Sequence, residues 1–186
     1  MVIDSNYLIW LDLEMTGLDV EQNTIIEIAT IITDNELNIV AKGPDLVIHQ
    51  SQAALDAMDD WNTTHHTESG LVKAVQQSKI SLHEAEQQTL AFFQQYLSAG
   101  QSPLCGNSVH VDRLFLCRHM PTLQSFFHYR NIDVSTLKEL ARRWAPKVFA
   151  QLQKNSGHRA LADIEESINE LRYYRQHFIV PQVNLS

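Results

Sequence analysis

The chain has 186 residues, a formal net charge of −8, and 44% hydrophobic and 19% charged residues. This size and composition predict a single domain spanning residues 1–186 with a substantial core. Its apolar runs are shorter than the roughly 18 residues that cross a membrane, and residues 1–6 do not resemble a signal peptide. We therefore expect a cytoplasmic protein that does not insert into membranes, with Cys105 and Cys117 reduced.

The charge is divided unevenly along the chain. Residues 1–112 contain three lysines against sixteen acidic residues, a net charge of −13, whereas residues 113–186 carry a net charge of +5. This asymmetry is explained either by chance variation over a solvated surface or by an acidic metal pocket that faces a modestly basic wall. Proteins that track along a duplex make many phosphate contacts through a basic face, so the composition argues against long-duplex binding.

Three apolar and β-branched segments near the N-terminus predict consecutive strands. The expected strands are residues 7–14, 24–33 and 38–48, and a hairpin turn is expected at residues 34–37. Strands joined by short turns pair antiparallel with their neighbours. The fold is therefore expected to begin with a three-stranded antiparallel meander.

Helical patterns dominate the rest of the chain. Apolar residues recur at helical spacing across residues 81–97, which open with a capping box at Ser81 and Glu84, and across residues 158–177. Shorter helices are expected at residues 51–61, 68–78, 111–120 and 136–144, and short strands at residues 103–106 and 131–134. This order predicts an α/β fold with a mixed sheet and helices on both faces.

Asp12 and Glu14 lie two positions apart at the end of the first predicted strand. Side chains at i and i+2 of a strand project from the same face, and two like charges so close raise each other's pKa unless a cation lies between them. The pair therefore indicates a metal site. The same spacing, usually a solvated turn or a helix start, recurs at Asp19/Glu21, Asp34/Glu36 and Asp163/Glu165, but only the first pair ends a strand that looks buried.

Further candidate site residues lie at the boundaries of predicted elements. Asp112 follows a Gly-Asn-Ser segment at a predicted helix start, where the helix dipole also favours an acid. His158 and Asp163 are five residues apart and would lie roughly 140° apart on one helix, so they converge only if His158 lies on the preceding loop. Taken alone, each group is explained as well by an ordinary helix N-terminus.

Together these groups form the ordered series Asp-x-Glu, Asn…Asp and His-x-x-x-x-Asp, which resembles the histidine-bearing branch of the DEDD exonuclease superfamily. Within that branch the sequence is similar to the oligoribonuclease family across residues 6–178. The similarity rests on residues 10–18, 26–29, 69–71, 106–108, 129–130 and 158–163, together with Trp61, His65 and His66. One departure is Asn62, where many members of the family have cysteine.

The resemblance implies a ribonuclease-H-like fold and a 3′–5′ exoribonuclease with a two-metal-ion mechanism. Because hard oxygen ligands and a phosphate substrate suit Mg²⁺ or Mn²⁺ better than zinc, two such ions would be bound by Asp12, Glu14, Asp112 and Asp163. Two ions stabilise the attacking and the departing oxygen of an in-line displacement. His158 would act as the general base, and very short single-stranded RNA would yield nucleoside 5′-monophosphates.

The resemblance also assigns a contact for the 5′-phosphate of the RNA. Ser135 and Thr136 lie at an expected helix N-terminus, where Thr136 and Glu139 have the spacing of a capping box. From the residues alone this is an ordinary helix cap. The family resemblance favours phosphate binding there, with Ser108 and the planar guanidinium of Arg130 alongside.

The remaining candidates contact bases or the partner subunit. Leu18 and Trp61 are either base contacts or core residues, and His66 is a further candidate for substrate binding. The family is homodimeric, which implies that Tyr129 and Arg130 reach the active site of the partner subunit.

Three other functions are compatible with parts of the pattern. A DNA-directed relative, such as a proofreading exonuclease, would share the acidic residues, but the acidic charge balance and the phosphate contact favour short RNA. A catalytically inactive nucleic-acid-binding module would have lost metal ligands, and all four acids and His158 are present. A structural α/β protein would leave the co-occurrence of these five residues unexplained.

Overall fold

The computed structural model describes residues 6–152 and 159–179, and it confirms the expected α/β architecture. Five strands form one mixed sheet in the order β3-β2-β1-β4-β5. They are β1 (Leu8–Met15), β2 (Ile25–Thr33), β3 (Ile39–Val47), β4 (Leu104–Gly106) and β5 (Asn131–Asp133). The first three strands form the predicted antiparallel meander, whereas β4 pairs parallel to β1 and β5 pairs parallel to β4.

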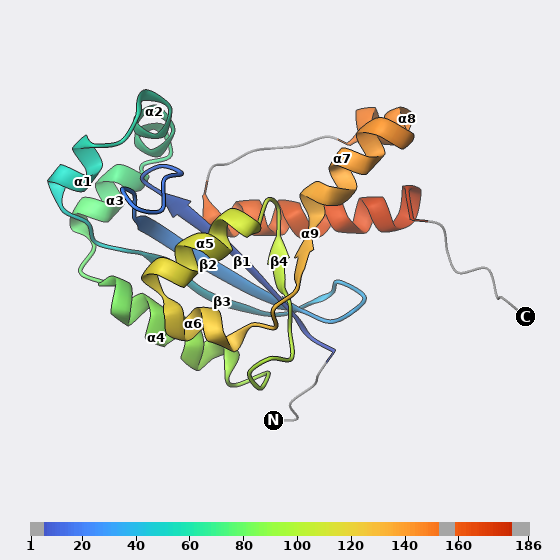
Figure 1. The fold of residues 1–186 in the computed structure, drawn as a ribbon, viewed down its shortest axis with the longest axis horizontal. Helices are drawn as coiled ribbons and strands as arrows, with labels where there is room; N and C mark the ends of the chain where they lie inside the picture. Colours follow the sequence, from blue (N-terminus) through green and yellow to red (C-terminus); the bar gives the residue numbers. More distant parts are fainter. Residues whose placement is uncertain (1–5, 153–158, 180–186) are drawn as a thin grey trace, which may run out of the picture.

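Helices cover both faces of this sheet (Figure 1). One face packs against α4 (Leu82–Phe93), α5 (His110–His119) and α6 (Pro121–Phe126). The other face packs against α7 (Val134–Trp144), α8 (Pro146–Gln151) and the long α9 (Ala160–His177). Three further helices group beside the end toward which β1 runs: α1 (Gln52–Asp56), α2 (Asp60–Glu68) and α3 (Leu71–Gln77). Within the described residues, no helix is long and apolar enough to span a membrane.

The alternation of side chains along β1 divides the core into two parts. Ile9 and Leu11 belong to the core between the sheet and α4–α6, whereas Trp10 belongs to the core between the sheet and α9. Every residue of β2 is buried, as expected for a central strand between two helical layers. Asp12 and Glu14 continue the Trp10 side of β1, so the fold places them on the face that α9 covers.

Among the differences between the observed and the predicted helices, two have a clear local cause. Residues 51–61 do not form one helix, because Asp59 accepts a hydrogen bond from Asn62 N at 2.8 Å and starts α2 as its N-cap. The sequence patterns do not predict α6 and α8. Both begin at a proline, which fits the first turn of a helix because no N–H donor is needed there.

Candidate metal centre and substrate site

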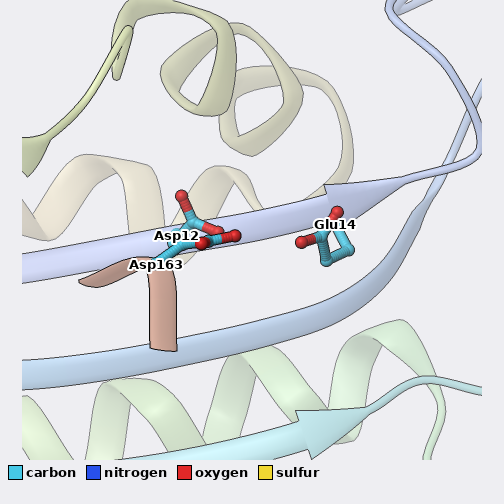
Figure 2. Close-up of side chains that lie close together, drawn as sticks. All are labelled: Asp12, Glu14 and Asp163. Atoms are coloured by element: carbon cyan, nitrogen blue, oxygen red, sulfur yellow. The ribbon is translucent and has the colours of Figure 1, made fainter. Parts of the chain in front are cut away.

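Three carboxylates from two elements converge on one side of β1. Asp12 and Glu14 project from β1, and Asp163 meets them from the first turn of α9 (Figure 2). One oxygen atom from each side chain lies within 4.8 Å of the others. The structure therefore brings these three predicted residues together, and they are called the carboxylate cluster below.

Asp112 reaches β1 from α5, on the opposite layer. The ladder between β1 and β4 ends at Trp10 and Cys105, so the following residues of β1 are open to a different partner. Asp112 lies there, 5% exposed, and its Oδ1 accepts a hydrogen bond from Leu13 N at 2.9 Å. One oxygen of this carboxylate is thus committed to the backbone, and Asp112 lies beside the carboxylate cluster rather than within it.

The carboxylate cluster concentrates negative charge where water is partly excluded. Burial and the neighbouring carboxylates, Asp112 foremost, raise the pKa of Asp12 well above its ordinary value. Burial, followed by the charges of Asp163 and Glu27, raises the pKa of Glu14 to about 8. Burial also raises the pKa of Asp112 to about 7, although backbone hydrogen bonds oppose this shift. A cation among these groups would stabilise their ionised forms.

The donor set fits a divalent cation with a preference for hard oxygen ligands. Apart from Asp163, the acids of the other Asp-x-Glu pairs have different contacts. Asp19 and Asp34 each accept a hydrogen bond at 2.9 Å from the backbone N–H two residues later, which makes them turn residues. Glu165 forms a 2.5 Å ion pair with Lys42. Of the four pairs, the first alone contributes both of its acids to the carboxylate cluster.

Glu27 is a buried carboxylate that the sequence patterns do not single out. It pairs with Glu14 across β1 and β2, and its oxygens accept hydrogen bonds from Arg159 Nε at 2.8 and 3.1 Å. Glu27 also accepts from Ala160 N at 3.0 Å, and the N-cap residue of α9 makes no side-chain cap of its own. Glu27 therefore caps α9 from β2 and positions the turn that carries Asp163. The sequence signals for this residue are an acid inside an otherwise apolar predicted strand and its place in the family segment 26–29.

The two predicted site histidines have different outcomes. His158 lies outside the described residues. His66 is 1% exposed, and its Nε2 lies 3.0 Å from the carbonyl oxygen of Met15 at the end of β1. His66 therefore contacts the turn after β1, and its role in substrate binding stays a prediction.

Leu18 and Trp61 border one pocket beyond the end of β1. Leu18 is 76% exposed and Trp61 is 56% exposed, which excludes the alternative that they are core residues. A side chain at Gly17 would come within 2.6 Å of Asn23, so the turn that carries Leu18 outward needs glycine. Both apolar side chains are thus available to contact a base.

Ser108, Ser135 and Thr136 line one pocket at the start of α7, and they are called the hydroxyl pocket below. Ser108 has a φ of +50°, which is uncommon for a non-glycine residue, and its Oγ lies 3.1 Å from Ser135 Oγ. Arg130 lines a different pocket, and its guanidinium lies 5.3 Å from the centre of the exposed Tyr129 ring. The structure thus unites the three hydroxyl residues and places Arg130 of the same chain elsewhere.

Helix α7 starts earlier than its sequence pattern predicts. Asp133 is the N-cap, and its Oδ1 accepts a hydrogen bond from Ser135 N at 3.0 Å. The predicted capping box of Thr136 and Glu139 is therefore wrong. Glu139 instead pairs with two arginines in the last turn of the same helix.

Comparison with known proteins identifies close relatives of the whole chain. A family profile described as exonuclease matches residues 9–171. An oligoribonuclease of Alcanivorax borkumensis is 62% identical over 174 residues, which cover 94% of this chain and 96% of that protein. An oligoribonuclease of Yersinia enterocolitica is 58% identical over 179 residues, which cover 96% of this chain and 99% of that protein.

Solved structures of exonuclease I have the same ribonuclease-H-like fold. E. coli exonuclease I in complex with a dA16 oligonucleotide aligns with a TM-score of 0.71 at 13% identity, covering 93% of this chain and 41% of that one. Exonuclease I of Methylocaldum szegediense aligns with a TM-score of 0.67 at 19% identity, covering 92% and 41%. This chain spans less than half of these structures, so the likeness concerns the fold alone. The matched profile and the near full-length relatives establish that the chain belongs to the oligoribonuclease family of exonucleases.

Proposed function

We propose that this chain is a metal-dependent 3′–5′ exoribonuclease that hydrolyses very short oligoribonucleotides, dinucleotides above all, to nucleoside 5′-monophosphates. The observation that carries the proposal is the convergence of Asp12, Glu14 and Asp163 in a chain whose close relatives are oligoribonucleases. We place a single exonuclease domain at residues 1–186, with its core at about residues 6–178, and the enzyme in the cytoplasm, where its free cysteines would stay reduced.

The acidic residues would bind two Mg²⁺ or Mn²⁺ ions, and such a pair stabilises the attacking and departing oxygens of phosphodiester hydrolysis. The carboxylate cluster supplies three of the ligand side chains, and Asp112 offers the carboxylate oxygen that does not accept from Leu13 N. Glu27 keeps Asp163 in place through the first turn of α9. His158 would accept the proton of the attacking water, because an imidazole titrates near neutral pH.

Selection for short RNA requires contacts away from the scissile bond. We assign the 5′-phosphate to the hydroxyl pocket, where Ser and Thr hydroxyls and the positive end of the α7 dipole favour an anion. We assign the bases to Leu18 and Trp61, whose exposed apolar surfaces suit wedging and stacking.

We further propose a homodimer in which Tyr129 and Arg130 complete the substrate site of the partner subunit. Tyr129 is 74% exposed, and Arg130 is separated from the hydroxyl pocket of its own chain. Arg113 anchors this segment by donating to the carbonyl oxygens of Tyr129 at 2.9 Å and His128 at 2.8 Å. An exposed but anchored aromatic–arginine pair suits contact with a nucleotide bound outside its own subunit.

Subunit mixing tests the shared site. An Asp12→Ala chain and an Arg130→Ala chain should each turn over the dinucleotide poorly. A mixture refolded or exchanged into heterodimers should recover activity, because one of its two sites then combines intact acids with an intact Arg130. Recovery that is absent despite heterodimers detected by native mass spectrometry would contradict the shared site.

The activity itself is tested with a 5′-phosphorylated RNA dinucleotide, the matching DNA dinucleotide and a longer RNA, each with Mg²⁺ or with EDTA. We expect rapid, metal-dependent cleavage of the RNA dinucleotide and much slower cleavage of the longer RNA. Equal cleavage of both RNA lengths would contradict length selection. Activity that survives EDTA would contradict the metal mechanism.

A further inference from the structure

A series of side-chain hydrogen bonds links α9 to the segment after β4 through Asn107. Asn107 Nδ2 donates to Ser167 Oγ at 2.8 Å and to Glu170 Oε2 at 3.2 Å. Ser167 Oγ in turn donates to the carbonyl oxygen of Asp163 at 2.8 Å. Ser167 is 4% exposed and Glu170 is 2% exposed, so this half of the series is shielded from water.

The other half of the series reaches the hydroxyl pocket. Ser135 Oγ donates to Asn107 Oδ1 at 3.0 Å, and Ser108 N donates to Ser135 Oγ at 2.9 Å. Asp133 Oδ1 accepts from Ser108 N at 2.9 Å and from Ser135 N at 3.0 Å. One amide side chain therefore lies between a residue of the carboxylate cluster and two residues of the hydroxyl pocket.

These bonds join distant parts of the chain. Asn107 follows β4, whereas Ser167 lies 60 residues later on α9. The amide donates and accepts at once, a combination that neither an apolar side chain nor a carboxylate reproduces. Because Ser167 and Glu170 are buried, loss of the Asn107 amide removes a hydrogen-bond partner from each where water does not readily replace it.

We propose that Asn107 is a positioning residue that fixes the separation between the carboxylate cluster and the hydroxyl pocket and thereby sets the accepted substrate length. The inference rests on the proposed function, in which the scissile phosphate lies at the cluster and the terminal phosphate in the pocket. In a 5′-phosphorylated dinucleotide these phosphates are one nucleotide apart. A fixed separation selects that class of substrate, because a contact remote from the reaction then aligns the scissile bond.

The test compares three substrates in variants of the full chain. Asn107→Ala removes every hydrogen bond of the amide side chain. Ser167→Ala removes the link to the carbonyl oxygen of Asp163. Asn169 is exposed on the same helix, so Asn169→Ala is the control. Values of kcat and KM are measured for a 5′-phosphorylated dinucleotide and for its 5′-hydroxyl form. The p-nitrophenyl ester of thymidine 5′-monophosphate reports the carboxylate cluster without a terminal phosphate.

Asn107→Ala should lower kcat/KM for the phosphorylated dinucleotide by about 10²-fold. Its kcat/KM for the p-nitrophenyl ester should change by no more than about twofold. The preference for the 5′-phosphorylated over the 5′-hydroxyl dinucleotide should approach one. Ser167→Ala should shift this preference in the same direction by less. Asn107→Asp combined with Glu170→Gln exchanges donor and acceptor, and it should recover part of the preference that Asn107→Asp loses.

Equal losses on all three substrates, or an unchanged preference in folded Asn107→Ala, would overturn the inference and leave the proposed function standing. If Asn107→Ala does not fold, Ser167→Ala and the Asn107→Asp/Glu170→Gln pair decide in its place. Wild-type protein that cleaves neither dinucleotide would overturn the proposed function itself, and the inference with it.

Discussion

The carboxylate cluster and the hydroxyl pocket lie in one fold but are stabilised in opposite ways. In the cluster, burial and like charges raise the pKa of Asp12 and Glu14, so the folded chain disfavours their ionised forms. In the pocket, Ser108 N lies 2.9 Å from both Asp133 Oδ1 and Ser135 Oγ, so polar groups are paired within the protein. A cation would stabilise the ionised forms of the first region, whereas polar groups of the second are already paired with one another.

We expect this difference to separate catalysis, at the carboxylate cluster, from selection of the substrate, at the hydroxyl pocket. Metal binding at the cluster must displace protons, so cation concentration and pH should act there on both activity and stability. A pocket with internally paired polar groups keeps its shape before the substrate arrives and discriminates by fit. The two regions should therefore respond to different perturbations, and the following experiments separate them.

The largest effect is expected from Asp12→Asn. Loss of one ligand from the carboxylate cluster should lower kcat for the dinucleotide by roughly 10³-fold or more, equivalent to ~4 kcal/mol of transition-state stabilisation. The same change removes a like charge, so the melting temperature in EDTA should rise or stay constant. Asp19→Asn is the matched control, because Asp19 has the same spacing to a glutamate but forms an exposed turn. A variant with nearly full activity would contradict the metal assignment.

Glu27→Gln should have the next largest effect, through the placement of α9. Breaking the pair with Arg159 leaves a guanidinium without its buried partner, which should cost about 3 kcal/mol of unfolding free energy. Displacement of Asp163 should lower kcat by about 10²-fold. Denaturant unfolding and turnover measure the two effects. Glu36→Gln, which breaks an exposed pair with Arg175, should cost less than about 1 kcal/mol and leave kcat unchanged.

The dependence of stability on pH and metal follows from the raised pKa values. Between about pH 4.5 and 8, folded Glu14 keeps a proton that the unfolded chain has released, and Asp112 behaves likewise up to about pH 7. The folded state therefore binds more protons, and the unfolding free energy of the metal-free protein should fall as pH rises through this interval.

Metal should reverse this trend because bound cations replace the protons. Mg²⁺ at 100 times its Kd should add about 2.7 kcal/mol, or roughly 5–10 °C in melting temperature. The gain at a fixed Mg²⁺ concentration should be larger near pH 8 than near pH 6. Thermal unfolding with Mg²⁺ or EDTA at both pH values measures it. A gain that is equal at both pH values, or that persists in Asp12→Asn, would separate metal binding from the carboxylate cluster.

Local sequence patterns predict the sheet well because they encode the structural causes directly. Apolar and β-branched segments specify β1–β3, and strand alternation alone places Asp12 and Glu14 on one face. The division of residues 51–61 into α1 and α2 depends on the single cap at Asp59, which competes with an otherwise continuous helical pattern. Short helices such as α6 give too few turns for a periodic pattern.

The site is predictable only where its residues follow from local rules or family motifs. Glu27 acquires its role from the register that pairs it with Glu14 and from Arg159, 132 residues later in the sequence. The role of Asn107 depends in the same way on a partner 60 residues away. Such contacts arise when the layers of the fold come together, and no periodicity within one element specifies them.

The smallest effect is expected in the hydroxyl pocket, and it should depend on the substrate. Ser108→Ala removes one neutral hydroxyl, so kcat/KM for the 5′-phosphorylated dinucleotide should fall about 5- to 20-fold, with little change for the 5′-hydroxyl form. The control is Ser125→Ala. The Ser125 hydroxyl donates to the carbonyl oxygen of Thr122 on α6. Metal affinity and the pH dependence of stability should stay as in the wild type. If Ser108→Ala instead changes metal affinity, the two regions are not separate, and selection and chemistry share one set of residues.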